Sequence, residues 1–160
     1  MRYAQHTEVP VEKSRAEIEA LLIRYGAEKF MVGSDQKKAV LAFQIRGKMV
    51  QFTLPLPSRT DKQFTHFTRG HVNPREYPRD EALAFKSWEQ ACRSSWRALR
   101  LCIQAKLEAV ACGITTFESE FLAHFVMPDG HTIGEHLIPK IDEVSKSGKM
   151  PQLLLGMGTE

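Results

Sequence analysis

The apolar side chains near the N-terminus recur at helical spacing. They are Ile18, Leu21, Leu22 and Tyr25. Ser14-Arg15-Ala16-Glu17, directly before them, has the pattern of a capping box, in which the Ser hydroxyl and the Glu carboxylate satisfy free backbone N–H groups. Gly26 is a helix stop signal. The pattern therefore predicts a short amphipathic helix that begins at Ser14.

Residues 27–56 change to the two-residue period that is typical of β-strands. Apolar and polar positions alternate in Lys38–Arg46 and again in Met49–Leu56. Gly47-Lys48 between these runs predicts a two-residue hairpin turn with Gly first. With a further strand in Ala27–Val32, the runs predict a three-stranded antiparallel meander.

Residues 57–79 show no period. They contain Pro57, Pro74 and Pro78 together with Gly70. An irregular segment of this length in a small domain is uncommon, and such segments are usually functional or disordered. We therefore expect an irregular loop here.

A long helix is predicted from Asp80 to Gly113, because no Gly or Pro interrupts this segment. Its large apolar residues share one stripe, which holds Phe85, Trp88, Cys92, Trp96, Leu99, Ile103, Leu107 and Val110. Small residues form a neighbouring stripe, which holds Ala91, Ala98, Cys102, Ala105 and Ala109. Two adjacent stripes predict a central helix that is packed on two sides.

Two shorter helices are predicted in the C-terminal part. Thr115 or Thr116 caps the first, and Thr132 with Glu135 forms a capping box for the second. Pro139 lies inside the second helix and predicts a kink or a break there.

The last residues, 149–160, form an apolar tail. This tail either docks onto a neighbouring subunit, which would make a homo-oligomer, or closes the protomer's own core. The elements together predict a single α+β domain over residues 1–160: a short helix, the meander, the long helix and two shorter helices.

The net charge of +3 conceals an uneven distribution. Residues 57–79 carry five basic and two acidic side chains, which equals the whole net charge, whereas residues 113–160 carry three basic and seven acidic ones. Both polyanion binding and protein association are compatible with this distribution.

Several protein classes are excluded by simple patterns. No apolar run approaches the roughly 20 residues of a membrane span, so we expect no membrane interaction. The N-terminus opens no apolar signal sequence. Cys92, Cys102 and Cys112 are spaced ten residues apart on the predicted helix, too far for an intrachain disulfide, and free thiols favour a cytoplasmic location.

The predicted loop combines cations with aromatic and imidazole side chains. They are Arg59, Lys62, Phe64, His66, Phe67, Arg69, His71, Arg75, Tyr77 and Arg79. Cations bind phosphate and aromatic rings stack on bases, so this composition is typical of single-stranded nucleic-acid or nucleotide binding. The alternative is a solvated loop whose rings fold back onto the core.

A second basic cluster lies on one face of the long helix. It consists of Lys86, Arg93, Arg97 and Arg100. Like charges one turn apart repel by a few tenths of a kcal/mol. The cluster therefore contacts an anionic ligand, is neutralised by acidic neighbours from the C-terminal part, or is an ordinary solvated face. The candidate acidic neighbours are Glu118, Glu120, Asp142 and Glu143.

The chain contains no recognisable catalytic or metal-binding motif. Lys106 lies between the two stripes, where a desolvated amine could act as base or nucleophile, but a Lys stem more often lies along apolar surface. His131, Glu135 and His136 resemble a zinc motif at the wrong spacing, and their imidazoles would diverge on a helix. We expect no cofactor and no metal.

Three stretches of the chain resemble a group of small proteins encoded by phages and prophages. They are Val11–Glu19 (VEKSRAEIE), Trp96–Leu99 (WRAL) with Ala105–Val110 (AKLEAV), and Gly113–Phe117 (GITTF) with Phe121–His124 (FLAH). The resemblance covers most of the chain and least of the loop. It implies a phage setting inside a bacterial cell and no catalytic residue.

The leading expectation is a phage-type, non-enzymatic protein that binds nucleic acid or a nucleotide phosphate through the loop and the basic helix face. The alternative is a protein-interaction module, such as an inhibitor of a host defence protein, that uses the acidic C-terminal part as its contact surface. A third hypothesis is an enzyme that uses Lys106 or a loop histidine.

Overall fold

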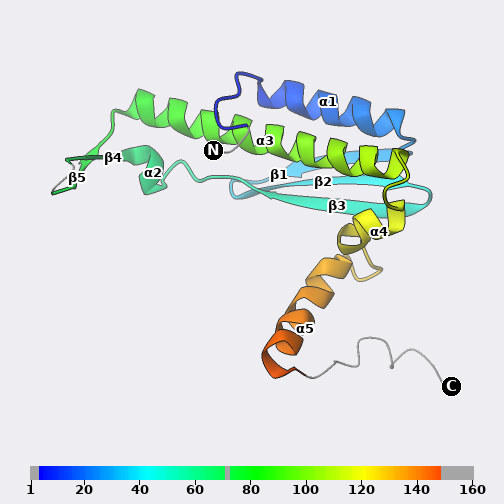
Figure 1. Ribbon diagram of the computed structural model, residues 1–160. Coiled ribbons are helices and arrows are strands. Elements are labelled where there is room, and N and C mark those ends of the chain that lie inside the picture. The colour runs from blue at the N-terminus through cyan, green and yellow to red at the C-terminus, as the bar shows by residue number, and fades with distance from the viewer. Residues whose placement is uncertain (1–3, 71–72, 149–160) are drawn as a thin grey trace.

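The computed structural model describes residues 4–70 and 73–148 and has the predicted α+β class (Figure 1). In chain order its elements are α1 (Val11–Arg24), β1 (Lys29–Ser34), β2 (Lys38–Ile45), β3 (Lys48–Pro55), α2 (Lys62–Thr65), β4 (His66–Arg69), β5 (Arg75–Pro78), α3 (Glu81–Ala111), α4 (Phe117–Phe121), the 3-10 helix η1 (Leu122–His124) and α5 (Ile133–Ser147). The apolar tail, 149–160, lies outside the described residues.

The meander β1-β2-β3 is antiparallel, as the alternation predicts. The pairing of Ile45 with Lys48 leaves Arg46 and Gly47 as the turn, one residue earlier than predicted. Both turn residues have positive φ, 52° and 73°, which is the type I′ geometry that matches the twist of a hairpin. Gly is therefore the second turn residue rather than the first.

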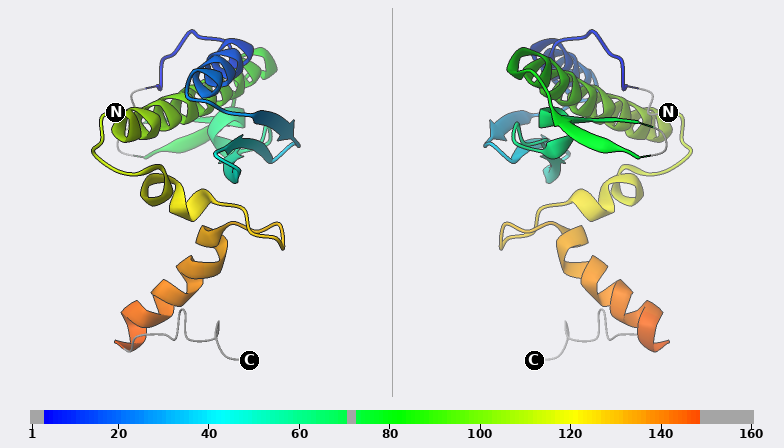
Figure 2. Two further views of the ribbon diagram at one scale, coloured as in Figure 1. Left: turned by 90° about the vertical axis from the view of Figure 1, so that its right-hand side faces the viewer. Right: turned by 90° about the vertical axis from the view of Figure 1, so that its left-hand side faces the viewer.

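Helices α1 and α3 lie side by side on one face of this sheet (Figure 2). From Cys92 to Leu107, the stripe of large apolar residues on α3 is buried against α1 and the sheet. Phe121 of α4 packs edge-on against Phe43 and Phe52, with ring centroids 6.1 and 6.3 Å away, and so closes the core beside β3.

The small-residue stripe of α3 is not covered as predicted. Ala98, Cys102 and Ala105 are exposed. Nearer the start of α3, the N-terminal segment contacts this side of the helix, where Ser94 Oγ donates to the Gln5 carbonyl at 3.2 Å. Packing of α1 and of the sheet buries the middle of the large stripe, whereas Phe85 stays exposed and Trp88 half-buried near the start of α3.

The prediction of a capping box at Ser14 is wrong. Helix α1 begins at Val11, and the backbone N–H of Ser14 already donates to Pro10 O at 3.1 Å. The Ser14 hydroxyl is fully buried and has no hydrogen-bond partner. Glu17 does not reach back to the helix start, because its carboxylate lies against α3 instead.

The segment 57–79 is not irregular throughout. It forms the short helix α2 and the antiparallel hairpin β4-β5, in which four residues pair with four. These strands are short and mostly exposed, so they carry no alternation that a sequence pattern could reveal.

The C-terminal caps agree with their prediction. The Thr116 hydroxyl accepts from Ser119 N, and Thr132 with Glu135 makes both hydrogen bonds of a capping box. Helix α5 continues through Pro139, so the break predicted there does not occur.

Candidate functional site

The basic face of α3 is largely neutralised inside the protein. Arg97 Nη1 donates to Glu17 Oε2 at 2.6 Å, and Arg100 Nε lies 3.1 Å from the same oxygen. Arg93 pairs with Glu89 one turn earlier, at 3.3 Å. The acidic partners are therefore on α1 and on α3 itself, not in the C-terminal part as the hypothesis of acidic neighbours supposed.

Two candidate residues of segment 57–79 are committed to packing. Phe64 is buried in the body of the protein, which is the alternative that the sequence left open for the aromatic rings. The Arg59 guanidinium lies over the rings of Trp88 and Phe85, 4.2 and 4.8 Å from their centroids. Arg59 therefore ties this segment to α3 through cation–π contacts.

Three more candidates make local polar contacts. Lys62 pairs with Glu76 at 3.3 Å, and Arg79 Nη1 donates to Ser87 Oγ at 2.6 Å. His66 Nδ1 lies 2.9 Å from Thr65 Oγ1. His71 lies outside the described residues, and Lys86 is exposed on α3.

The remaining four side chains share one face of the β4-β5 hairpin. Phe67 pairs with Tyr77, and Arg69 pairs with Arg75, two residues further toward the turn. Because side chains on a strand alternate between faces, these two pairs lie on the same face. The rings of Phe67 and Tyr77 are stacked, with centroids 5.8 Å apart and planes 28° apart, and each residue is 41% exposed.

The position of the hairpin favours contact with a large ligand. Figure 1 shows it at one end of the molecule, beyond the sheet and before the start of α3. Its one carboxylate, Glu76, belongs to the opposite face and is occupied by Lys62. Among the described residues, none forms an ion pair or hydrogen bond with the guanidinium of Arg69 or Arg75.

Like charges directly opposite each other on two strands destabilise the pairing. The Arg69–Arg75 pair is thus an unfavourable arrangement in the free protein, and a bound anion would relieve the repulsion. We refer to Phe67, Arg69, Arg75 and Tyr77 as the hairpin face. The sequence contained a signal for this hairpin: Gly70 and Asn73 are typical turn residues, and Phe67 precedes them while Tyr77 follows them.

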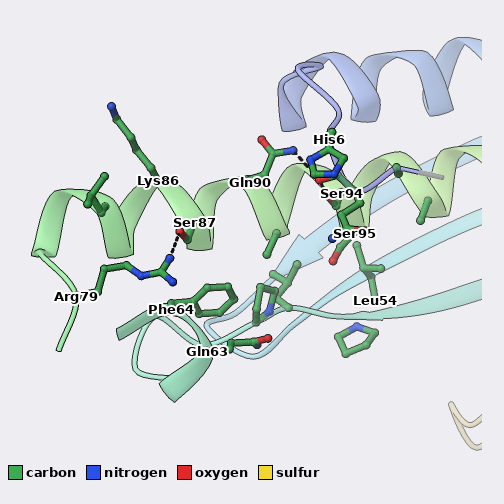
Figure 3. Close-up of a pocket in the computed structure, with 18 of the residues that line it drawn as sticks. His6, Leu54, Gln63, Phe64, Arg79, Lys86, Ser87, Gln90, Ser94 and Ser95 are labelled. Atoms are coloured by element: carbon green, nitrogen blue, oxygen red, sulfur yellow. Dashed lines mark hydrogen bonds between the residues drawn. The ribbon is translucent and has the colours of Figure 1, made fainter. Parts of the chain in front are cut away.

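A groove of about 1660 Å³ runs along the side of α3 that carries Ala91 and Ala98 (Figure 3). This groove was not predicted from the sequence. Its wall on α3 includes Ala91, Ser94 and Ala98, and its floor includes Leu54 and Phe64. No acidic side chain is among the described residues that line it, whereas Arg79 and Lys86 are. The exposed small-residue stripe of α3 was the available signal.

Lys106, which the sequence offered for catalysis, is held in structural contacts. Lys106 Nζ lies 2.9 Å from Glu120 Oε1 and also donates to the Glu120 carbonyl at 3.1 Å. Burial raises the pKa of the Cys92 thiol, which keeps it protonated and unreactive at neutral pH.

The two C-terminal imidazoles do not diverge as predicted. His131 precedes α5 instead of lying on it, and its ring centroid is 5.8 Å from that of His136. His136 Nε2 lies 2.7 Å from Asp129, and His131 Nδ1 lies 3.7 Å from Glu135. Over residues 4–70 and 73–148, no group of three or more His, Cys, Asp or Glu side chains has the arrangement of a metal site.

The described helices include none that is both long and apolar enough to span a bilayer. Comparison of the chain with protein-family models, with curated protein sequences and with solved structures finds no match.

Proposed function

We propose that this protein binds single-stranded nucleic acid through the hairpin face. The observation that carries the proposal is the juxtaposition of an exposed, stacked aromatic pair with two guanidiniums that no described residue pairs, on one face of a projecting hairpin. Aromatic rings that stack on bases, beside cations that follow the phosphates, are the general means of binding single strands.

The geometry of the pair fits an unpaired base. Phe67 and Tyr77 are each 41% exposed, so part of the stacked pair is accessible to a base. Arg69 and Arg75 lie two residues from the rings, about 6.6 Å along each strand, within reach of the phosphates that flank a stacked base. A base paired inside a duplex presents no free ring face, so single strands are preferred over duplex.

The site is smaller than the set of residues that the sequence nominated. Arg97 and Arg100 are excluded because Glu17 already neutralises them, and Phe64 is excluded because it is buried. The phage resemblance, carried into the proposal, would place this binding in the cytoplasm of a bacterial cell.

The alternative of a host-protein contact through acidic residues has weaker support. Most of the carboxylates that it requires are engaged within the protein. Glu118 pairs with Lys48, Glu120 with Lys106 and Asp129 with His136. Among the described residues, the acidic side chains of the C-terminal part that remain exposed without an ion pair are Asp142 and Glu143 of α5.

Fluorescence anisotropy with labelled single-stranded DNA, single-stranded RNA and duplex DNA, across a salt series, tests the proposal. Alanine at Phe67 and Tyr77 should remove stacking of about 1–3 kcal/mol per base, which weakens binding by about 5- to 150-fold. Glutamine at Arg69 and Arg75 should reduce the slope of log K against log salt by about 1.4, which is two contacts at about 0.7 each.

A matched control carries glutamine at Lys13 and Lys140, two exposed cations on α1 and α5, which are helices that lie away from the hairpin (Figure 1). It changes the net charge as much as the double arginine variant does, and should leave the slope within error of the original. The proposal is refuted by an absence of binding to every single strand at low salt. An equal loss of binding in the control variant also refutes it, because the binding would then follow net charge alone.

A further inference from the structure

Helix α5 projects from the body of the protein, away from α3 and the sheet (Figures 1 and 2). Its first turn is anchored firmly. Gly134 is buried against Ala123, where a Cβ would lie 2.8 Å from the Ala123 carbonyl oxygen, and the Thr132–Glu135 capping box closes the helix start. The direction of α5 is therefore set by a close backbone contact that only glycine permits.

The apolar face of α5 continues outward from that anchor, and no other described residue of the chain buries it. Ile138 and Ile141 are 58% and 50% exposed, and Leu137 and Val144 are partly exposed. Successive members of this face follow each other at helical spacing, so they form one continuous stripe. An exposed apolar stripe on an anchored helix is typical of a helix that docks into a groove.

The groove along α3 has the dimensions for such a helix. Its residues on α3 extend from Leu83 to Leu101, a length of about 27 Å at 1.5 Å per residue, and the 15 residues of α5 span about 22 Å. The small side chains of Ala91 and Ala98 in its wall allow close approach of a helix. Ser94 in the same wall donates to the carbonyl of Gln5 at 3.2 Å, so the N-terminal segment forms one border of the groove.

The charges are complementary as well. Asp142 follows Ile138 by one helical turn, so its carboxylate borders the apolar stripe. The described lining of the groove contains Arg79 and Lys86 and no carboxylate. Lys140 borders the other edge of this stripe, one turn before Val144, so α5 as a whole carries three carboxylates against two lysines. The helix therefore has a small excess of negative charge to offer to the basic lining of the groove.

The anchored α5 points away from the groove of its own chain, so a second copy must supply the occupant. We propose that the protein forms a symmetric dimer in which α5 of each protomer lies in the α3 groove of the other. Reciprocal exchange closes the assembly at two copies, because both grooves and both helices are then occupied. This inference is independent of nucleic-acid binding by the hairpin face.

Sedimentation velocity over a concentration series, with Ile138→Glu and Ala98→Trp variants, tests the exchange. The first variant should disable the helix and the second should block the groove, so each alone should sediment as a monomer. Both positions are exposed in the protomer, so the fold should survive, as circular dichroism and thermal melting will check. Ile23→Glu and Ala20→Trp on α1, which are equally exposed, are matched controls and should stay dimeric.

Mixing the two disabled variants gives the sharpest result. One partner then provides an intact helix and the other an intact groove, so a heterodimer with one of the two contacts should form. A wild-type protein that stays monomeric at high micromolar concentration overturns the proposal. An Ala98→Trp variant that remains dimeric also overturns it, because association would then not use the groove.

Discussion

Replacement of Glu17 by glutamine tests whether the basic face of α3 is structural. Glu17 Oε2 lies 2.6 Å from Arg97 Nη1 and 3.1 Å from Arg100 Nε, and this carboxylate joins α1 to α3. Glutamine preserves the size of the side chain and removes the charge. The two guanidiniums then remain close together on one helix face without their counter-charge.

The expected cost follows from the burial of the three side chains. Their exposed fractions are 29% for Glu17, 22% for Arg97 and 20% for Arg100, so solvent screens the pairing only in part. A hydrogen bond to a charged group contributes about 1.5–3 kcal/mol, and we take about 2 kcal/mol for this partly screened arrangement. For a domain of this size, that loss lowers the Tm by about 4–8 °C.

Urea unfolding of Glu17→Gln, with Glu19→Gln as the control, measures the effect. Glu19 is exposed on the same helix and loses the same charge, so its stability should change by less than about 0.5 kcal/mol. A double-mutant cycle with Arg97→Gln should return most of the loss as coupling energy. If Glu17→Gln is as stable as the control, the reasoning is refuted, and Arg97 and Arg100 return as candidate ligand contacts.

Two further predictions concern stability. Ser14→Ala should leave the unfolding free energy unchanged or raise it by up to about 1 kcal/mol, because no described residue hydrogen-bonds the buried hydroxyl. If Ser14 were a helix cap, the substitution would instead lower the unfolding free energy by about 1 kcal/mol. Urea unfolding distinguishes the two outcomes. Burial, and the charge of Lys106, hold the pKa of His124 below its ordinary value of 6.5, where the ring stacks 4.0 Å from Phe52. The unfolded state then binds the proton more readily, so this stabilisation is present above pH 6.5 and is lost as the pH falls below it. Unfolding measured between about pH 8 and pH 5 should therefore depend less on pH in His124→Gln than in the original protein, and equal pH dependence would contradict the assignment.

Local signals in the sequence predict most of the secondary structure. The alternation in residues 38–56 predicts β2 and β3, and the uninterrupted segment from Asp80 predicts α3. Thr132 and Glu135 predict the start of α5. These features succeed because caps, turns and periods depend on residues within a few positions of each other.

The same kind of signal fails where a distant partner competes. Ser14 and Glu17 match a capping box, but Glu17 is taken by arginines 80 residues further along the chain. The hairpin β4-β5 is missed for a different reason. Its two short strands bury no apolar face, so no period in the sequence marks them.

By itself, the sequence determined which residue types were available for a binding surface: cations and aromatic rings concentrated in residues 57–79 and on one face of α3. Only the tertiary structure decided which of them are free. Glu17, supplied by α1, neutralises the helix face, and the body of the protein buries Phe64. Strand register leaves Arg69 and Arg75 side by side beside an open aromatic pair. A charge is available to a ligand only when no folded neighbour satisfies it, and that neighbour is set by packing across the whole chain.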